Sequence, residues 1–177
     1  MSSTKVRRDR LFKHSKPTLR PYADSDFWVL WAAYDLGSFP GLAAGATKDQ
    51  FRNYLDLIRG SAGCLVAEDD CKWFKDKRGP VAFITLKSDG WQTHPAVDFF
   101  KWTTPRRKLR VLVAALQKAR WSKEIGVIVI RSLQGSQRML EVVNEYGHLV
   151  TPVGTIPEGT PTGDEFLYYL RGQRKAG

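Results

Sequence analysis

Apolar residues recur along this chain with two different periods, and each change of period marks a new element. Residues 47–59 carry apolar side chains at helical spacing, and Thr47 and Gln50 have the spacing of a capping box. Residues 64–68 and 81–86 are short apolar runs on either side of a charged turn, which is typical of a hairpin. These segments predict a helix followed by two antiparallel strands.

A continuous β-branched run at residues 125–130 is typical of a strand buried on both faces and paired in parallel. A helix that begins at Pro105 precedes it and follows a third strand, so this part of the chain predicts a β-α-β crossover. Over the whole chain the pattern predicts helices at 26–36, 47–59, 105–119 and 137–146, and strands at 18–20, 64–68, 81–86, 96–103, 125–130, 149–153 and 166–170. The order is β-α-α-β-β-β-α-β-α-β-β, an α/β (α+β) arrangement.

Composition indicates one folded domain. The chain has 177 residues, of which 42% are hydrophobic and 12% aromatic, enough for a single core. No apolar run reaches the roughly 18 residues of a spanning helix, and no signal peptide is recognisable. Cys64 and Cys71 lack the spacing of a metal site or of a disulfide framework. We therefore expect a soluble cytoplasmic protein with reduced thiols, no metal and no membrane contact.

The net charge of +10 is concentrated in the two terminal segments. Residues 1–20 carry seven basic side chains against one acidic, and residues 171–177 carry three basic and no acidic side chains. We therefore expect a domain at 17–171 between basic tails at 1–16 and 172–177. Such a segment attracts phosphates or acidic surfaces without sequence preference, so nucleic-acid contact through residues 1–20 is one expectation and a solvated tail is the other.

Several segments carry a resemblance to a known superfamily. Leu19-Arg20-Pro21 precedes the acidic helix start Asp24-Ser25-Asp26, residues 96–103 lead into a basic turn and a helix, and residues 136–147 form a helix closed by glycine. With the element order, these segments resemble the GNAT N-acetyltransferases over residues 17–171. The resemblance implies a mixed, mostly antiparallel sheet with helices on both faces. It also implies an enzyme that transfers an acetyl group from acetyl-CoA to an amine.

The resemblance further implies where acetyl-CoA binds. In the superfamily a strand exposes its backbone to pantetheine, and the loop and helix after it bind the pyrophosphate through a Q/R-x-x-G-x-G/A motif. Here the glycine positions are filled by Leu109 and Val111, or by Arg110 and Leu112 in the other register. The basic side chains either replace the missing backbone donors or form a solvated first turn. The expected cofactor-binding residues are Phe100, Trp102, Thr103, Arg106, Arg107, Lys108, Leu109, Arg110 and Val111.

Acetyl transfer also needs a base for the amine and an acid near the leaving thiolate. The superfamily often has a tyrosine four residues before the glycine that ends its last helix, where this chain has Val143. Tyr146 is the nearest replacement, rotated about 60° from that position. Asp98, within an apolar strand, and Glu68, at a strand end, are the candidate bases. Each of the three also fits an ordinary structural role.

The departures from the motif favour a second interpretation, in which the fold has lost catalysis. Small size, basic tails and an eroded motif are also similar to phage-encoded acetyltransferase-like proteins, some of which are carried in virions. Trp73 and Phe74 lie at the expected hairpin tip, where exposed aromatics would indicate a protein contact. The alternative is therefore a structural or assembly protein, in the virion rather than the cytoplasm, with a protein partner.

Overall fold

A computed structural model describes residues 11–12, 16–39, 42–88, 92–120, 127–133, 137–144, 150–160 and 163–171. The chain folds into two compact units. The first unit consists of Ser15–Lys87 and Ala96–Val111, and the second contains Ser88–Pro95 and the described residues from Leu112 onward. Most of the two basic tails lies outside the described residues.

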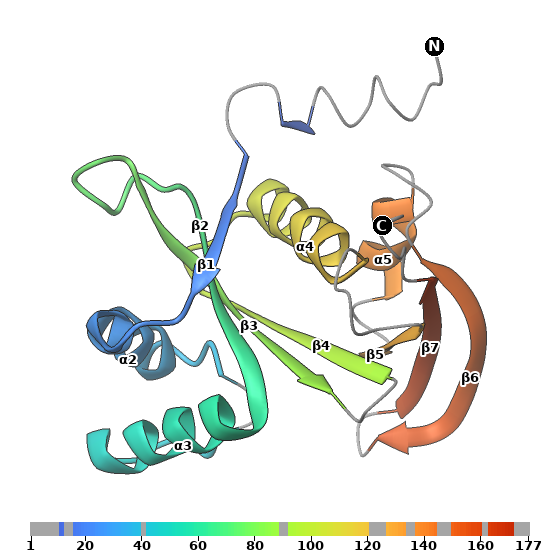
Figure 1. The fold of residues 1–177 in the computed structure, drawn as a ribbon, viewed down its shortest axis with the longest axis horizontal. Helices are drawn as coiled ribbons and strands as arrows, with labels where there is room; N and C mark the ends of the chain where they lie inside the picture. The colour runs from blue at the N-terminus through green and yellow to red at the C-terminus, as the bar shows by residue number, and fades with distance from the viewer. Residues whose placement is uncertain are drawn as a thin grey trace, which may run out of the picture. The chain divides into compact units, whose positions relative to one another are not determined.

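The observed elements follow the predicted order along the chain (Figure 1). They are β1 (Thr18–Pro21), the 3-10 turn η1 (Asp24–Asp26), α2 (Phe27–Asp35), α3 (Lys48–Ser61), β2 (Ala62–Asp70), β3 (Arg78–Ser88), β4 (Gln92–Phe99), α4 (Pro105–Arg120), β5 (Val127–Leu133), α5 (Gln137–Asn144), β6 (Thr151–Thr160) and β7 (Gly163–Arg171). The hydrogen-bonded strand order is β1-β2-β3-β4-β5-β7-β6. The predicted fold class, a mixed and mostly antiparallel sheet with one crossover, is confirmed.

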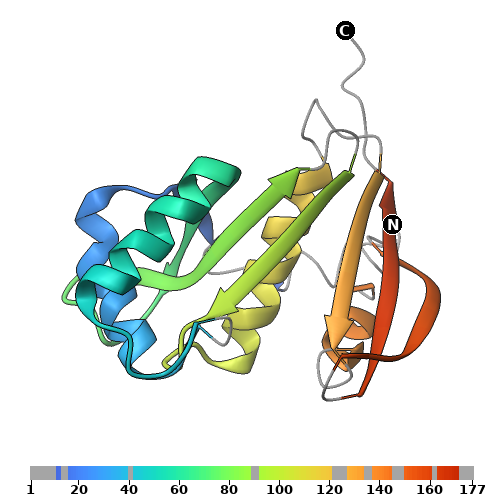
Figure 2. The ribbon, with the colours of Figure 1, turned by 90° about the horizontal axis from the view of Figure 1, so that it is seen from below.

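The first unit is built on an antiparallel ladder in which β2 pairs with β1 on one side and with β3 on the other. Helices α2 and α3 lie side by side over one face of these strands, and the start of α4 lies over the other face (Figure 2). The predicted capping box is present at the start of α3. Thr47 N–H donates to Gln50 Oε1 at 2.8 Å, and Gln50 N–H donates to Thr47 Oγ1 at 3.3 Å.

Aromatic side chains fill the space between this helix pair and the sheet. Phe51 of α3 is fully buried at the centre of the cluster, in ring contact with Tyr34 and Phe39. Phe39 in turn contacts Phe83 of β3 and Phe100, which follows β4. The burial of apolar rings on three elements is the main stabilising term for this unit.

The second unit contains the remaining ladders. β5 pairs antiparallel with β7 from Val127↔Arg171 to Leu133↔Glu165, and β7 pairs antiparallel with β6. β4 pairs with β5 in parallel through two residue pairs, Gln92↔Val127 and Thr93↔Ile128. Because α4 connects these two parallel strands, the predicted β-α-β crossover is confirmed.

Two local predictions were wrong. The third strand ends at Phe99 rather than Thr103, because the chain turns there: the Thr103 N–H donates to the carbonyl of Phe100 at 2.9 Å. Asp24 and Ser25 do not cap a helix at Asp26. They lie in η1 instead, and the Asp26 carboxylate accepts a hydrogen bond from the Ala23 N–H at 2.9 Å. This bond satisfies one of the free N–H groups that precede α2.

Candidate functional site

The carboxyl group of Asp98, on β4, has an unusual environment for an aspartate. It lies two residues before the buried Phe100, and strand alternation places both side chains on the face covered by α2 and α3. The side chain is half-buried, and this burial raises the pKa of Asp98 to about 6. A carboxyl group with that pKa exchanges protons near neutral pH, as a general base must.

Tyr54 is a further titratable side chain that lies close to Asp98, and Cys64 lies close to Tyr54. Tyr54 of α3 has its pKa raised by burial, and then by electrostatic interaction with Asp98 and with Cys64. Burial also raises the pKa of the Cys64 thiol on β2, so this cysteine, which is not in a disulfide, stays protonated at neutral pH. Asp98, Tyr54 and Cys64 come from β4, α3 and β2, so the fold assembles a small polar cluster beside an aromatic core. Tyr54 was missed by sequence reasoning because its spacing marked it only as a helix-face residue.

The residues expected to hold pantetheine are hydrogen-bonded to β3 instead. The Phe100 N–H and the Thr103 hydroxyl both donate to the carbonyl of Val81, at 3.1 Å and 2.6 Å. The Trp102 indole N–H donates to the carbonyl of Pro80 at 2.9 Å. These bonds hold the β4–α4 loop, residues 100–104, against the hairpin of β2 and β3.

Helix α4 begins where the sequence predicts. The expected phosphate-binding residues in its first two turns fall into two groups, one exposed or half-buried and one buried. Arg106 is exposed, while Arg107, Lys108 and Leu109 are half-buried. The Lys108 ammonium lies 5.6 Å from the centre of the Phe99 ring. These basic side chains are available to an anion at the first turn.

Arg110 and Val111 form the second group and point into the first unit. Val111 is fully buried, and the Arg110 guanidinium donates to Asp69 of β2 at 2.9 Å. Both residues lie within α4 and not in a loop, so Arg110 has a structural ion pair where a phosphate contact was expected. The positions at which the superfamily motif has glycine lie inside α4 in this chain, so they do not form a phosphate-binding loop.

Glu68 is also part of an ion-pair network. The Arg20 guanidinium donates to Glu68 at 2.8 Å and forms a two-point contact with Asp26 at 2.6 and 2.7 Å. Burial acts to raise the pKa of Asp26, but the hydrogen bonds from Arg20 and from the Ala23 N–H lower it below its usual value. Arg20 of β1 therefore joins Glu68 of β2 to Asp26 at the start of α2. Tyr146, the remaining candidate, lies outside the described residues.

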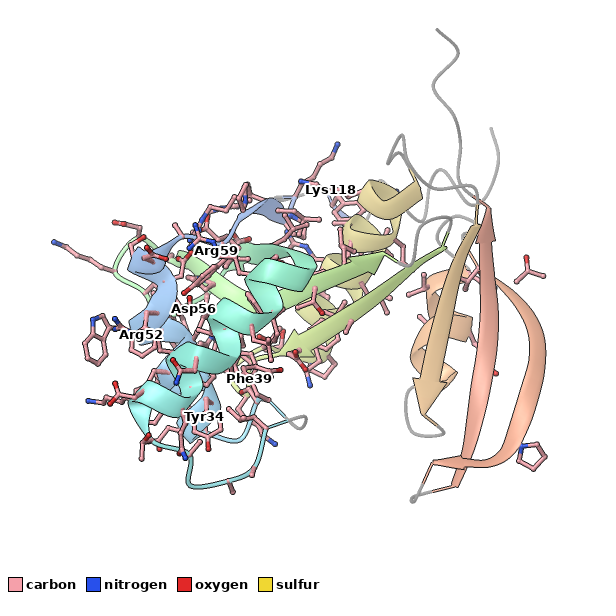
Figure 3. All side chains as sticks on the ribbon, turned by 60° about the horizontal axis from the view of Figure 1, so that its bottom comes forward. Tyr34, Phe39, Arg52, Asp56, Arg59 and Lys118 are labelled. Atoms are coloured by element: carbon pink, nitrogen blue, oxygen red, sulfur yellow. The ribbon has the colours of Figure 1, made fainter. Side chains whose placement is uncertain are left out.

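Cationic side chains of α3 cover the aromatic cluster from outside. Figure 3 shows Arg52, Asp56 and Arg59 along one side of this helix. The Arg52 guanidinium lies 4.4 Å from the centre of the Phe27 ring, and Arg59 forms an ion pair with Asp24 at 2.9 Å. The spacing of these side chains is that of one helix face, so this surface stabilises the packing of α3 on α2.

The sequence matches no protein-family model and no curated protein. No helix among the described residues is long and apolar enough to cross a membrane. Solved structures, in contrast, are clearly similar. A chimera of spermidine N-acetyltransferase SpeG from Vibrio cholerae and hSSAT has a TM-score of 0.69 at 12% identity, covering 89% of this chain and 96% of that chain.

Two other similar structures are named for different acceptors. A putative phosphinothricin N-acetyltransferase has a TM-score of 0.63 at 15% identity, covering 90% of this chain and 100% of its own. The ribosomal-protein-alanine N-acetyltransferase from Brucella melitensis has a TM-score of 0.62 at 14% identity, covering 87% and 99%. At identities this low, the similarity indicates a shared fold and does not indicate a shared substrate. The chain has the fold of the GNAT N-acetyltransferases.

Proposed function

We propose that this protein is an acyl-CoA-dependent N-acetyltransferase that uses acetyl-CoA as acetyl donor and a primary amine as acceptor. The fold supports the reaction class, and the half-buried carboxyl group of Asp98 is the observation that carries the proposal. One similar structure, the spermidine N-acetyltransferase from Vibrio cholerae, was determined in complex with CoA and spermine, at 11% identity and a TM-score of 0.64. That likeness supports the donor and leaves the acceptor of this chain open.

The role proposed for Asp98 is that of general base. As the amine nitrogen forms its bond to the thioester carbonyl carbon, a proton on nitrogen becomes acidic and passes to the Asp98 carboxylate. The C–S bond then breaks, and the sulfur leaves as the thiolate of CoA, which takes a proton from solvent water and becomes the thiol. With a pKa of about 6, Asp98 is mostly ionised at neutral pH and still more basic than an ordinary aspartate. Glu68 is unsuited to this role because one of its carboxyl oxygens already accepts a hydrogen bond from the Arg20 guanidinium at 2.8 Å.

The first turn of α4 fits the phosphates of the donor. Pro105 has no N–H group, and the Lys108 N–H already donates to the Thr104 carbonyl at 2.9 Å. The N–H groups of Arg106 and Arg107 therefore have no acceptor within the helix. The same two residues add guanidinium groups, which bind phosphate oxygens in two-point contacts. Positive charge at a helix start opposes the helix dipole, so an anion there removes an unfavourable interaction.

The test combines binding and turnover. Titration calorimetry with acetyl-CoA is expected to show saturable one-to-one binding that weakens in Arg106→Ala/Arg107→Ala. Thiol release is then followed with spermidine, phosphinothricin and a peptide with an N-terminal alanine as acceptors. The variant Asp98→Asn is expected to lose roughly 100-fold or more in kcat with donor affinity unchanged.

Asp56→Asn, at an exposed carboxylate on α3, is the matched control and should keep full activity. If acetyl-CoA neither binds nor stabilises the protein at millimolar concentration, the proposed function is wrong. If it binds and is turned over equally by Asp98→Asn, the reaction stands and the assignment of the base is wrong.

A further inference from the structure

An apolar groove in the first unit does not include Asp98. It has a volume of about 460 Å³ and is lined by Val29, Ala32, Leu36, Trp73, Phe74, Lys101 and Trp102. These residues come from the outer side of α2, the tip of the β2–β3 hairpin and the β4–α4 loop. Six of the seven side chains are apolar, although Trp73 is 72% exposed and Leu36 is 56% exposed. Exposed apolar surface gathered in a concave site is typical of a binding site.

Helix α2 supplies one wall because it is apolar on both sides. Its inner side buries Phe27, Leu30 and Ala33 in the core. Its outer side presents Val29 and Ala32 where a surface helix ordinarily carries polar residues. The small side chain of Ala32 leaves the space between the two walls open.

The opposite wall is held in place by the hairpin tip. Within the tip, the Cys71 N–H donates to the Lys77 carbonyl at 2.7 Å, and the Lys77 N–H donates to the Phe74 carbonyl at 2.9 Å. The Phe74 ring lies so close over Gly79 that a methyl group there would overlap it. Phe74 also makes an edge contact with Trp102, with ring centres 6.5 Å apart. The aromatic wall is therefore preformed.

Lys101 provides the one charge that lines the groove. Its backbone N–H donates to the buried Ser38 hydroxyl at 3.0 Å, and its side-chain stem passes beside Gly37 at the end of α2. Among the described residues, no carboxylate forms an ion pair with its ammonium group. An apolar groove with one available cation complements a molecule that has an apolar body and one negative charge.

We propose that this groove binds a small organic carboxylate with an aryl or short alkyl body. The body lies between Trp73 and the outer side of α2, and the carboxylate accepts a hydrogen bond from the Lys101 ammonium. The volume lies within the usual range for small-molecule sites, roughly 300–1,000 Å³.

The experiment titrates the full chain with phenylbutyrate by calorimetry, and with phenylbutylamine as the probe of opposite charge. Phenylbutyrate is expected to bind saturably and phenylbutylamine at least about fivefold more weakly. Lys101→Gln should weaken phenylbutyrate binding roughly threefold to tenfold, and Trp73→Ala by a similar factor. Ala32→Trp should abolish binding by filling the groove, and since Ala32 is exposed, the melting temperature should stay near that of the wild type.

Trp28→Ala is the matched control, because Trp28 is a 63% exposed tryptophan on the same helix that does not line the groove. It should bind phenylbutyrate as the wild type does. Absence of saturable binding overturns the proposal. Equal affinity for the amine probe, or unchanged binding in Ala32→Trp, also overturns it, since the apolar body or the charge would then be recognised elsewhere. These readouts do not depend on acetyl transfer.

Discussion

The carboxylate of Asp69 on β2 and the guanidinium of Arg110 on α4 lie 2.9 Å apart, and both side chains are almost completely buried. Burial raises the pKa of Asp69, because the carboxylate has lost its contact with water. The short distance to Arg110 must therefore compensate for this lost solvation. Asp70 lies at the edge of the pair, 3.9 Å from the same guanidinium. The pair fixes the first half of α4 on the face of the sheet opposite to α2 and α3.

Arg110→Leu is expected to lower the free energy of unfolding by about 3–5 kcal/mol, because it leaves the Asp69 carboxylate buried without its cation. Urea unfolding measures the change. The double variant Asp69→Leu/Arg110→Leu should recover much of the loss, since no charge is then buried. Arg106→Leu on the exposed side of the same helix should change the free energy by less than about 0.5 kcal/mol. A loss in Arg106→Leu as large as that in Arg110→Leu would contradict the structural role given to the pair.

Asp98 is expected to make stability depend on pH. Its pKa is about 6 in the folded protein against an ordinary value of 3.8, so the unfolded chain releases this proton first as pH rises. Stability from this group is therefore present below about pH 4 and is lost between about pH 4 and 6. Asp98→Asn should remove that dependence and stabilise the protein at pH 7 by about 1–3 kcal/mol.

Thermal unfolding across this pH range measures the effect, with Asp56→Asn as control. The same group predicts that kcat with any accepted amine rises with pH through an apparent pKa near 6. A variant that is both more stable and inactive is the expected signature of a functional carboxylate in an unfavourable environment. If the difference in the free energy of unfolding between Asp98→Asn and the wild type did not change with pH, the pKa of Asp98 would not be raised in the folded protein.

The Arg20 network is expected to stabilise the N-terminal edge of the sheet. Arg20→Met removes the partner of the buried Asp26 and of Glu68, and should lower the free energy of unfolding by about 1–3 kcal/mol. Asp26 has a lowered pKa, so its contribution is present above its unfolded pKa and is lost as pH falls through the lower folded value. Arg20→Lys keeps the charge but not the two-point geometry and should show an intermediate loss. Denaturant unfolding at neutral and acidic pH distinguishes the three proteins.

Gly79 is expected to tolerate no side chain. A Cβ atom there would overlap the Phe74 ring, so Gly79→Ala must displace the ring and should cost about 1–3 kcal/mol. Gly63→Ala on β2 is the matched control, because its Cβ would meet no atom closer than 3.8 Å. It should be neutral or slightly stabilising. Both are measured by thermal unfolding, and equal effects would mean that Phe74 moves freely.

Part of this description follows from local sequence. The order of helices and strands, the Thr47–Gln50 capping box, the start of α4 at Pro105 and the parallel pairing of β5 were all predictable, because apolar period, caps and β-branched runs act over a few residues. The end of β4 was predicted four residues late. Aromatic residues continue past Phe99 at Phe100 and Trp102, and only the hydrogen bond from the Thr103 N–H to the Phe100 carbonyl shows that the chain turns there.

The roles of the polar residues were decided by the tertiary structure. By sequence alone, Asp98 and Glu68 were equivalent candidates for a base, and Arg110 was equivalent to Arg106 as a phosphate ligand. Packing gave Glu68 and Arg110 charged partners from distant parts of the chain and left Asp98 desolvated beside Tyr54. Charge pairing and desolvation depend on residues far apart in sequence and close in space, so no local pattern could have separated them.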